Sequence, residues 1–232
     1  MKKYSAMFLA IAVLFGVFPY ASNAVELLEA SAVITESTVI RKADPEILGV
    51  GSEWSSGNSK MMKSETSLEI SDEFAKGISG IKYMPLARTA GSSLNNFFWK
   101  NSVGEYENRK TPGAPGVWYF TGDKINFGPV EWIKSSLAAD ENCKFVVGIN
   151  VYNESPQLNG EYAEFMTGDA NTSKLGALRA QCGIEKPVDV FAYELGNELD
   201  GSLSAEEYCK RIKASIKEIK KSRPGRKIYC LR

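Results

Sequence analysis

The segment best equipped for chemistry reads Tyr193-Glu194-Leu195-Gly196-Asn197-Glu198. An apolar run from Val188 to Leu195 predicts a strand, and its end carries a glycine, an amide and a carboxylic acid. In a parallel barrel, such strand ends lie at the mouth where ligands bind. A carboxyl group that is partly removed from water can serve as a proton donor, and an amide beside it can hydrogen-bond the ligand. We therefore predict that Glu198 is catalytic and that Asn197 binds substrate.

The Asn-Glu pair also has an interpretation without chemistry. After a buried strand, Asn197 could cap the start of a helix, and Glu198 could favour the positive end of its dipole. Glu194 lies inside the predicted strand and is interpreted as an interior polar residue.

Composition narrows the chemistry further. The 232 residues contain 28 basic and 28 acidic side chains and no histidine. The balanced charge gives no reason to expect nucleic acid or an anionic membrane as partner. Without histidine, Ser-His-Asp catalysis and His-based metal sites are excluded, and carboxylates become the main candidates for acid/base work. No metal or organic cofactor is expected.

Short apolar strands alternate with helical patterns through most of the chain. Strands are predicted at Ile47–Gly51, Tyr83–Arg88, Lys144–Val151, Val188–Leu195 and Lys227–Leu231. Helices are predicted at Ser71–Ile78, Pro129–Ala139, Glu161–Ala180 and from a Ser204–Glu207 capping box onwards. This alternation predicts an α/β fold with a parallel sheet. A doubly wound nucleotide-binding sheet is disfavoured, because the first strand is not followed by a complete Gly-rich phosphate loop. We expect a partial (β/α)8 TIM barrel, about its first five strands, preceded by short β-strands.

The strand at 193–198 resembles the "W/Y-E-L/I-G-N-E" strand of clan A glycoside hydrolases, particularly the α-L-arabinofuranosidases and the heparanase-like β-glucuronidases. The similarity extends to the order of the weaker matches, from Leu48–Glu53 through Leu86–Gly91 and Phe145–Asn150 to Leu175–Ala180. It covers about Ile47 to Asp200. The resemblance implies a retaining hydrolase of O-glycosyl bonds in poly- or oligosaccharides, with Glu198 as general acid/base.

The resemblance and the strand-end rule also suggest residues that contact the sugar. Glu53 follows the first strand and matches a substrate-binding glutamate, and Arg88 ends the second strand where it could orient a carboxylate. Asn150 ends the third strand and could face the substrate. Trp54, Trp99 and Trp118 could stack on sugar rings, although packing in the core is an equally good interpretation.

The family pattern is not complete in this sequence. Ala90-Gly91 replaces the usual Pro-Gly after the arginine, and the family's nucleophile is a second glutamate at the end of the seventh strand. A barrel normally needs about 250 residues. We therefore expect a chain truncated before the nucleophile and inactive on its own. The alternative is a non-catalytic secreted carbohydrate-binding protein.

The N-terminus predicts export. Lys2 and Lys3 precede an apolar run, Ala6–Phe18, and Ser22-Asn23-Ala24 fits a cleavage site. We expect a signal peptide at 1–24, a β segment at 25–45 and the barrel portion at 46–232. The protein would be secreted or periplasmic, with a carbohydrate substrate and no membrane contact after cleavage. The sequence leaves the oligomeric state open, as it does the pairing of Cys143, Cys182, Cys209 and Cys230.

Overall fold

The computed structural model describes residue 44 and residues 47–55, 60–113, 120, 124–222 and 230–231. These residues belong to one compact unit, Ala43–Arg232. The predicted signal peptide and the β segment at 25–45 lie outside the described residues, apart from residue 44. None of the helices in the described part of the chain is long and apolar enough to cross a membrane.

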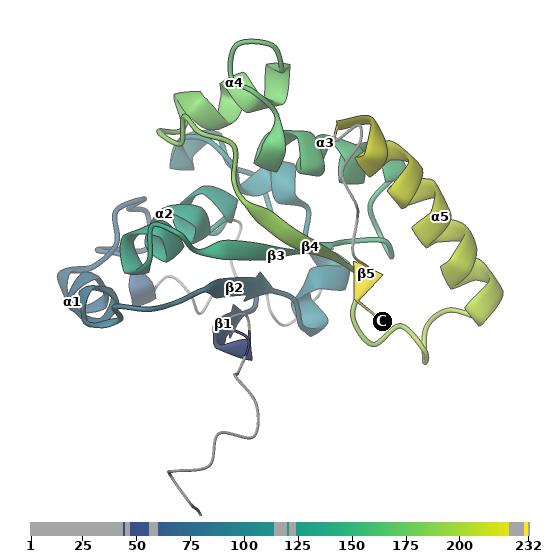
Figure 1. The fold of residues 1–232 in the computed structure, drawn as a ribbon, viewed down its shortest axis with the longest axis horizontal. Coiled ribbons are helices and arrows are strands. Elements are labelled where there is room, and N and C mark those ends of the chain that lie inside the picture. The colour runs from purple at the N-terminus through teal and green to yellow at the C-terminus, as the bar shows by residue number, and fades with distance from the viewer. Residues whose placement is uncertain are drawn as a thin grey trace, which may run out of the picture. The chain divides into compact units, whose positions relative to one another are not determined.

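Five parallel strands form one sheet in the order of the sequence (Figure 1). They are β1 Gly49–Ser52, β2 Leu86–Thr89, β3 Lys144–Ile149, β4 Val190–Leu195 and β5 Cys230–Leu231. Every neighbouring pair is parallel. A doubly wound sheet reverses its strand order at a switch point. No reversal occurs among the five described strands, so their order is that of a barrel, and the predicted fold class is confirmed.

Helices connect each strand to the next. They are α1 Asp72–Gly80, α2 Pro129–Ala139, α3 Pro156–Thr167, α4 Lys174–Gln181 and α5 Ala205–Ser222. The predicted span of α2 is confirmed at both ends. The stretch Glu161–Ala180, predicted to be mostly helical, contains parts of two helices, because Ser173 caps a new helix by accepting a hydrogen bond from the Gly176 amide at 2.9 Å. The strand predicted from Tyr83 begins later, at Leu86.

The cap of α5 agrees only in part with the predicted capping box. The Ser204 hydroxyl accepts a hydrogen bond from the Glu207 amide at 3.2 Å. The Glu207 carboxylate, however, binds the Arg211 guanidinium at 2.8 Å. Since α5 begins at Ala205, Asn197 and Glu198 are not its cap residues, and that interpretation of the Asn-Glu pair is wrong.

The two faces of the sheet differ in side-chain size. On one face, Phe145, Val147 and Ile149 of β3 join the hydrophobic core with helix residues such as Ile133 and Phe165, all of them fully buried. The opposite face is lined by smaller residues. Gly51 and Val146 are in register with Arg88, Gly148 is in register with Glu194, and Ala192 is in register with Val146. This face therefore has room for two long charged side chains.

Arg179 ties the C-terminal ends of α3 and α4 to the chain that leads into β4. Its side chain is fully buried and donates hydrogen bonds to backbone carbonyls at 2.8–3.3 Å. The acceptors are the carbonyls of Phe165, Met166, Gly168, Ile184 and Glu185. Burial lowers the pKa of Arg179, because the charged form loses its hydration. The five hydrogen bonds take the place of that water.

Replacing Arg179 with leucine should destabilise the fold strongly. The substitution leaves several buried carbonyls without a donor, which should lower the free energy of unfolding by about 3–5 kcal/mol. Urea denaturation followed by circular dichroism measures this change. Arg211→Leu removes a more exposed arginine that is paired with Glu207 and bonded to one backbone carbonyl, that of Tyr152, and should cost only about 1–2 kcal/mol. Equal losses in the two variants would contradict the assigned role.

Candidate active site

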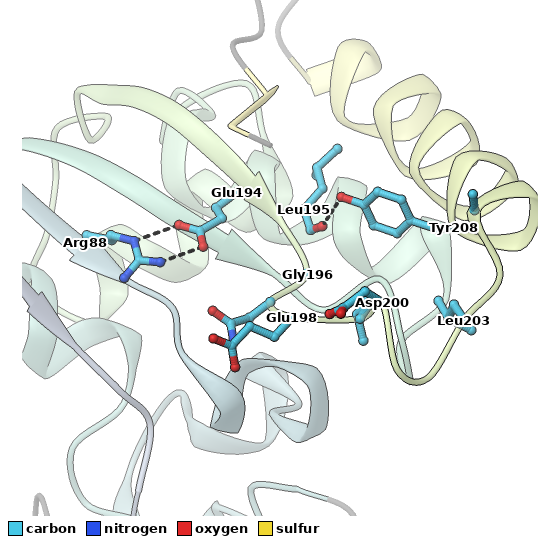
Figure 2. Close-up of a pocket in the computed structure, with 11 residues that line it drawn as sticks. Arg88, Glu194, Leu195, Gly196, Glu198, Asp200, Leu203 and Tyr208 are labelled. Atoms are coloured by element: carbon cyan, nitrogen blue, oxygen red, sulfur yellow. Dashed lines mark hydrogen bonds and ion pairs between the residues drawn. The ribbon is translucent and has the colours of Figure 1, made fainter. Parts of the chain in front are cut away.

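A pocket of about 840 Å³ lies at the carboxyl end of β4, beside the start of α5. Its polar part consists of Arg88, Glu194, Asn197, Glu198 and Asp200. Its remaining wall is largely apolar and includes Leu195, Leu199, Leu203 and the Tyr208 side chain. The Tyr208 hydroxyl donates a hydrogen bond to the Leu195 carbonyl at 2.9 Å, which joins α5 to the end of β4 (Figure 2).

Arg88 and Glu194 form a bidentate ion pair at this pocket (Figure 2). Arg88 Nε and one terminal nitrogen bind the two Glu194 oxygens at 2.7 and 2.6 Å. The Glu194 side chain is 12% exposed and that of Arg88 is 43% exposed. The hydrogen bond with Glu194 is the main cause of the raised pKa of Arg88, and the negative charge of Glu53 adds to it. The arginine thus stays charged and holds Glu194 in one orientation, in agreement with the interior role predicted for that glutamate.

Glu198 lies on the loop after β4, where its exposed side chain lines the pocket. Figure 2 shows its carboxylate on the side of the loop toward Arg88 and Glu194, away from Tyr208. The residue has a φ of 46°, and it is the one non-glycine residue in the described part of the chain with a positive φ. Strained backbone of this kind is often found at functional sites. A carboxylic acid in this place can donate a proton to a ligand bound in the pocket.

Of the other predicted site residues, the structure places two in the pocket and one outside it. Arg88 and Asn197 line the pocket with Glu198. Glu53 follows β1 and lies against Gly91, where an added Cβ would overlap the glutamate side chain. The negative charge of Glu53 contributes to the raised pKa of Arg88, but Glu53 is not one of the residues that line the pocket.

Two predicted substrate contacts must be corrected. Trp54 is fully buried, with its ring stacked on Phe97 at 4.5 Å and edge-on to Trp132, so it packs in the core and is not free to stack on a sugar. Asn150 is 3% exposed, and its amide donates to the Phe97 carbonyl at 3.0 Å. Its side-chain oxygen accepts hydrogen bonds from the backbone of the loop that follows. Asn150 is therefore a structural anchor.

Among the side chains that the structure describes, Trp99 and three of the cysteines show no ligand site either. Trp99 is buried and stacked on Tyr162, in agreement with the core-packing interpretation, and Trp118 lies outside the described residues. Cys143, Cys182 and Cys209 are free thiols. In the described ranges no cluster of cysteine, aspartate and glutamate could hold a metal ion.

The comparisons with known proteins agree with this geometry. The family model described as the alpha-L-arabinofuranosidase 1 domain matches residues 88–231, which is more than half of the chain. The chain belongs to this family. A search by sequence among curated proteins found no match.

Solved structures of arabinofuranosidases share the fold. The GH51 enzyme from Xanthomonas axonopodis pv. citri is 20% identical with a TM-score of 0.65, over 80% of this chain and 39% of that one. The family 51 enzyme AbfB from Bifidobacterium longum is 18% identical with a TM-score of 0.63, over 80% and 38%. An enzyme from Thermotoga maritima, in complex with arabinose, has a TM-score of 0.57 at 21% identity, over 70% and 34%. The chain thus spans about two fifths or less of the length of these enzymes.

Sequence patterns gave no indication that Glu154, in the loop between β3 and α3, has an unusual pKa. Burial raises the pKa of its carboxyl to about 8, against the opposing effect of the nearby Lys100 charge. The negative charge of Glu161 raises it further, and the Trp99 amide lowers it. A single glutamate after a strand carries no periodic or motif signal, so only the tertiary packing could reveal this environment.

The stability of the protein should fall as Glu154 ionises. The pKa of its carboxyl is about 8 in the folded protein, whereas the ordinary pKa of glutamate is 4.5. The protonated acid is favoured in the fold, so the stabilisation is complete below pH 4.5 and is lost as the pH rises through 8. Glu154→Gln should remove this part of the pH dependence and raise the thermal midpoint at pH 9 relative to the original protein. Parallel stability profiles for the two proteins between pH 5 and 9, measured by thermal melts, would argue against the assignment.

Proposed function

We propose that this protein supplies the acid/base part of a retaining glycoside hydrolase acting on α-L-arabinofuranosidic bonds, with Glu198 as proton donor. The observation that carries the proposal is the position of Glu198. It follows β4 at the carboxyl end of a parallel sheet, lines the pocket beside Asn197, and lies near a fixed Arg88–Glu194 pair. The family to which the chain belongs and the names of the similar solved enzymes support this substrate class.

The chemistry assigned to Glu198 has two parts. As the glycosidic C–O bond breaks, the carboxylic acid gives its proton to the departing oxygen. In the second step the resulting carboxylate takes a proton from the water that attacks the sugar. Asn197 hydrogen-bonds a sugar hydroxyl beside the bond that breaks. These roles need no metal or organic cofactor.

Retention also needs a carboxylate nucleophile about 5 Å from the acid/base. The polar part of the pocket contains two further carboxylates. Glu194 is held through both oxygens by Arg88, and Asp200 is on the same loop as Glu198. We assign neither as nucleophile, and turnover of aryl arabinofuranosides by this chain alone should be below detection.

Azide, a small external nucleophile, should restore turnover that depends on Glu198. An azide nitrogen attacks the anomeric carbon, the C–O bond breaks, and the Glu198 proton goes to the departing oxygen. With phenyl α-L-arabinofuranoside, whose leaving group needs that proton, Glu198→Gln should slow glycosyl azide formation by about 10²-fold or more. With the 4-nitrophenyl glycoside, whose leaving group is a much weaker base, Glu198→Gln should slow glycosyl azide formation far less. Chromatography of the azide product measures both rates.

The matched control is Glu206→Gln, which makes the same change at an exposed position in the first turn of α5. Its azide-supported rate should stay within about threefold of the original, as expected for a surface substitution. If Glu198→Gln behaved like this control on the phenyl glycoside, Glu198 would not be the proton donor. Arabino-oligosaccharide binding without any azide product would instead favour a carbohydrate-binding protein.

We also propose that the protein is exported. The basic residues, apolar run and small-residue site at the N-terminus support cleavage after Ala24. Expression of the full chain in a bacterial host should give a periplasmic or secreted product whose first residue is Val25, as read by mass spectrometry of the intact protein. A product that stays in the cytoplasm with residues 1–24 attached would refute the assignment.

A further inference from the structure

We propose that Asn95 is a positioning residue for Glu198. Its side-chain amide binds the backbone of Asn197 on both sides and so maintains the left-handed backbone that directs Glu198 into the pocket. The catalytic consequence of this contact rests on the proposed function, whereas the contact itself can be tested without it.

The contact consists of two hydrogen bonds between loops that are far apart in the sequence. Asn95 lies in the short 3-10 helix Ser92–Asn96 after β2. Its Nδ2 donates to the Asn197 carbonyl at 2.5 Å, and its Oδ1 accepts from the Asn197 amide at 3.1 Å. Since a peptide N–H can only donate and its C=O can only accept, this pairing fixes the orientation of the Asn95 amide. It also fixes both peptide groups that flank Asn197.

Glu198 needs this support because its backbone conformation is unfavourable. A φ of 46° brings the Cβ of an L-residue close to a carbonyl oxygen, and such a conformation persists only where the surroundings enforce it. On its C-terminal side, Leu199 is 7% exposed and anchored in the core. On its N-terminal side, the Asn95 contact holds the peptide group that Glu198 shares with Asn197. Glu198 thus lies between two fixed neighbours and has little freedom to relax.

Asn95 is itself held by the loop after β3. Asn153 Nδ2 donates to the Asn95 carbonyl at 2.8 Å and to Asn96 Oδ1 at 3.0 Å. The backbone N–H of Asn153 in turn donates to Oδ1 of the buried Asn150 at 2.9 Å. A chain of amide hydrogen bonds therefore joins the loops after β2, β3 and β4. Because Asn95 binds only the backbone of Asn197, the Asn197 side chain can still face a ligand.

NMR of the full chain tests the contact directly. The Cα and Cβ shifts and the HN–Hα coupling of Glu198 report whether its φ is positive. Asn95→Ala should abolish the left-handed signature and speed exchange of the Asn197 amide at least about tenfold. The matched control is Asn101→Ala, which removes an exposed amide bonded to the Thr111 carbonyl at 2.8 Å, and it should change neither reading. A Glu198 signature that survives in Asn95→Ala would overturn the proposal.

Asn95→Asp provides a second variant of nearly the same shape. An ionised aspartate still accepts from the Asn197 amide but repels the Asn197 carbonyl, so the signature should weaken at pH 7. Protonation below a pH of about 4 restores a donor, and the signature should return. This recovery separates the hydrogen bond from a general loss of folding, which acid would not repair. A signature that is equally strong at both pH values would also overturn the proposal.

The kinetic measurement separates positioning from substrate binding. For azide-supported cleavage of the phenyl glycoside, Asn95→Ala should lower kcat at least about tenfold and raise KM by a smaller factor, because the proton donor is displaced together with Asn197, whereas Arg88 and the apolar wall of the pocket stay in place. An unchanged kcat together with a lost left-handed signature would overturn the catalytic part of the inference. If Glu198→Gln itself has no effect on the azide reaction, the proposed function fails, and the NMR readings still decide the role of Asn95.

Discussion

The site depends on the hydrogen bonding that sets β2, β3 and β4 parallel and side by side. In register, Thr89 pairs with Val147, and Ile149 pairs with Leu195, so the carboxyl ends of the three strands meet at one edge of the sheet. Side-chain amides can therefore bond between loops whose contacting residues are 53 or 102 positions apart in the sequence. β3 lies at the centre of this arrangement and is almost wholly buried, which strengthens the register through core packing on one face.

The face of the sheet opposite the core explains why the ion pair can form there. Arg88 on β2 and Glu194 on β4 are separated by β3, and their side chains must span that strand to meet. Val146 and Gly148, the residues of β3 on that face, are small, and so is Ala192 next to Glu194. Larger side chains would occupy the volume above β3. The small residues on this face thus leave the space that the Arg88–Glu194 ion pair fills.

The elements were predictable where local signals are strong. Apolar runs predicted β3 and β4, and the bounds predicted for α2, with Pro129 in its first turn, were correct. The sequence could not show that Trp54 and Asn150 point into the interior, because a strand-end position does not reveal how the chain continues. Nor could it show the raised pKa of Glu154, which arises from burial beside Trp99 and Tyr162. Asn95 belongs to no recognisable motif, and its role depends on a residue 102 positions away.

The backbone at Glu198 links the fold to the chemistry. The motif gives glycine at 196, whose φ of 79° suits that residue, but it places a glutamate at 198 where φ is 46°. Glycine would adopt this conformation with less strain, so backbone preference alone does not explain the carboxylate there. A structural role does not explain it either, since Glu198 is exposed and does not cap α5. An unfavourable residue in a conformation that its neighbours enforce is what a functional requirement at that position would produce. Under the proposed function the side chain at 198 must be present and its direction must be constant, which hydrogen bonds from Asn95 can provide and a glycine at 198 cannot.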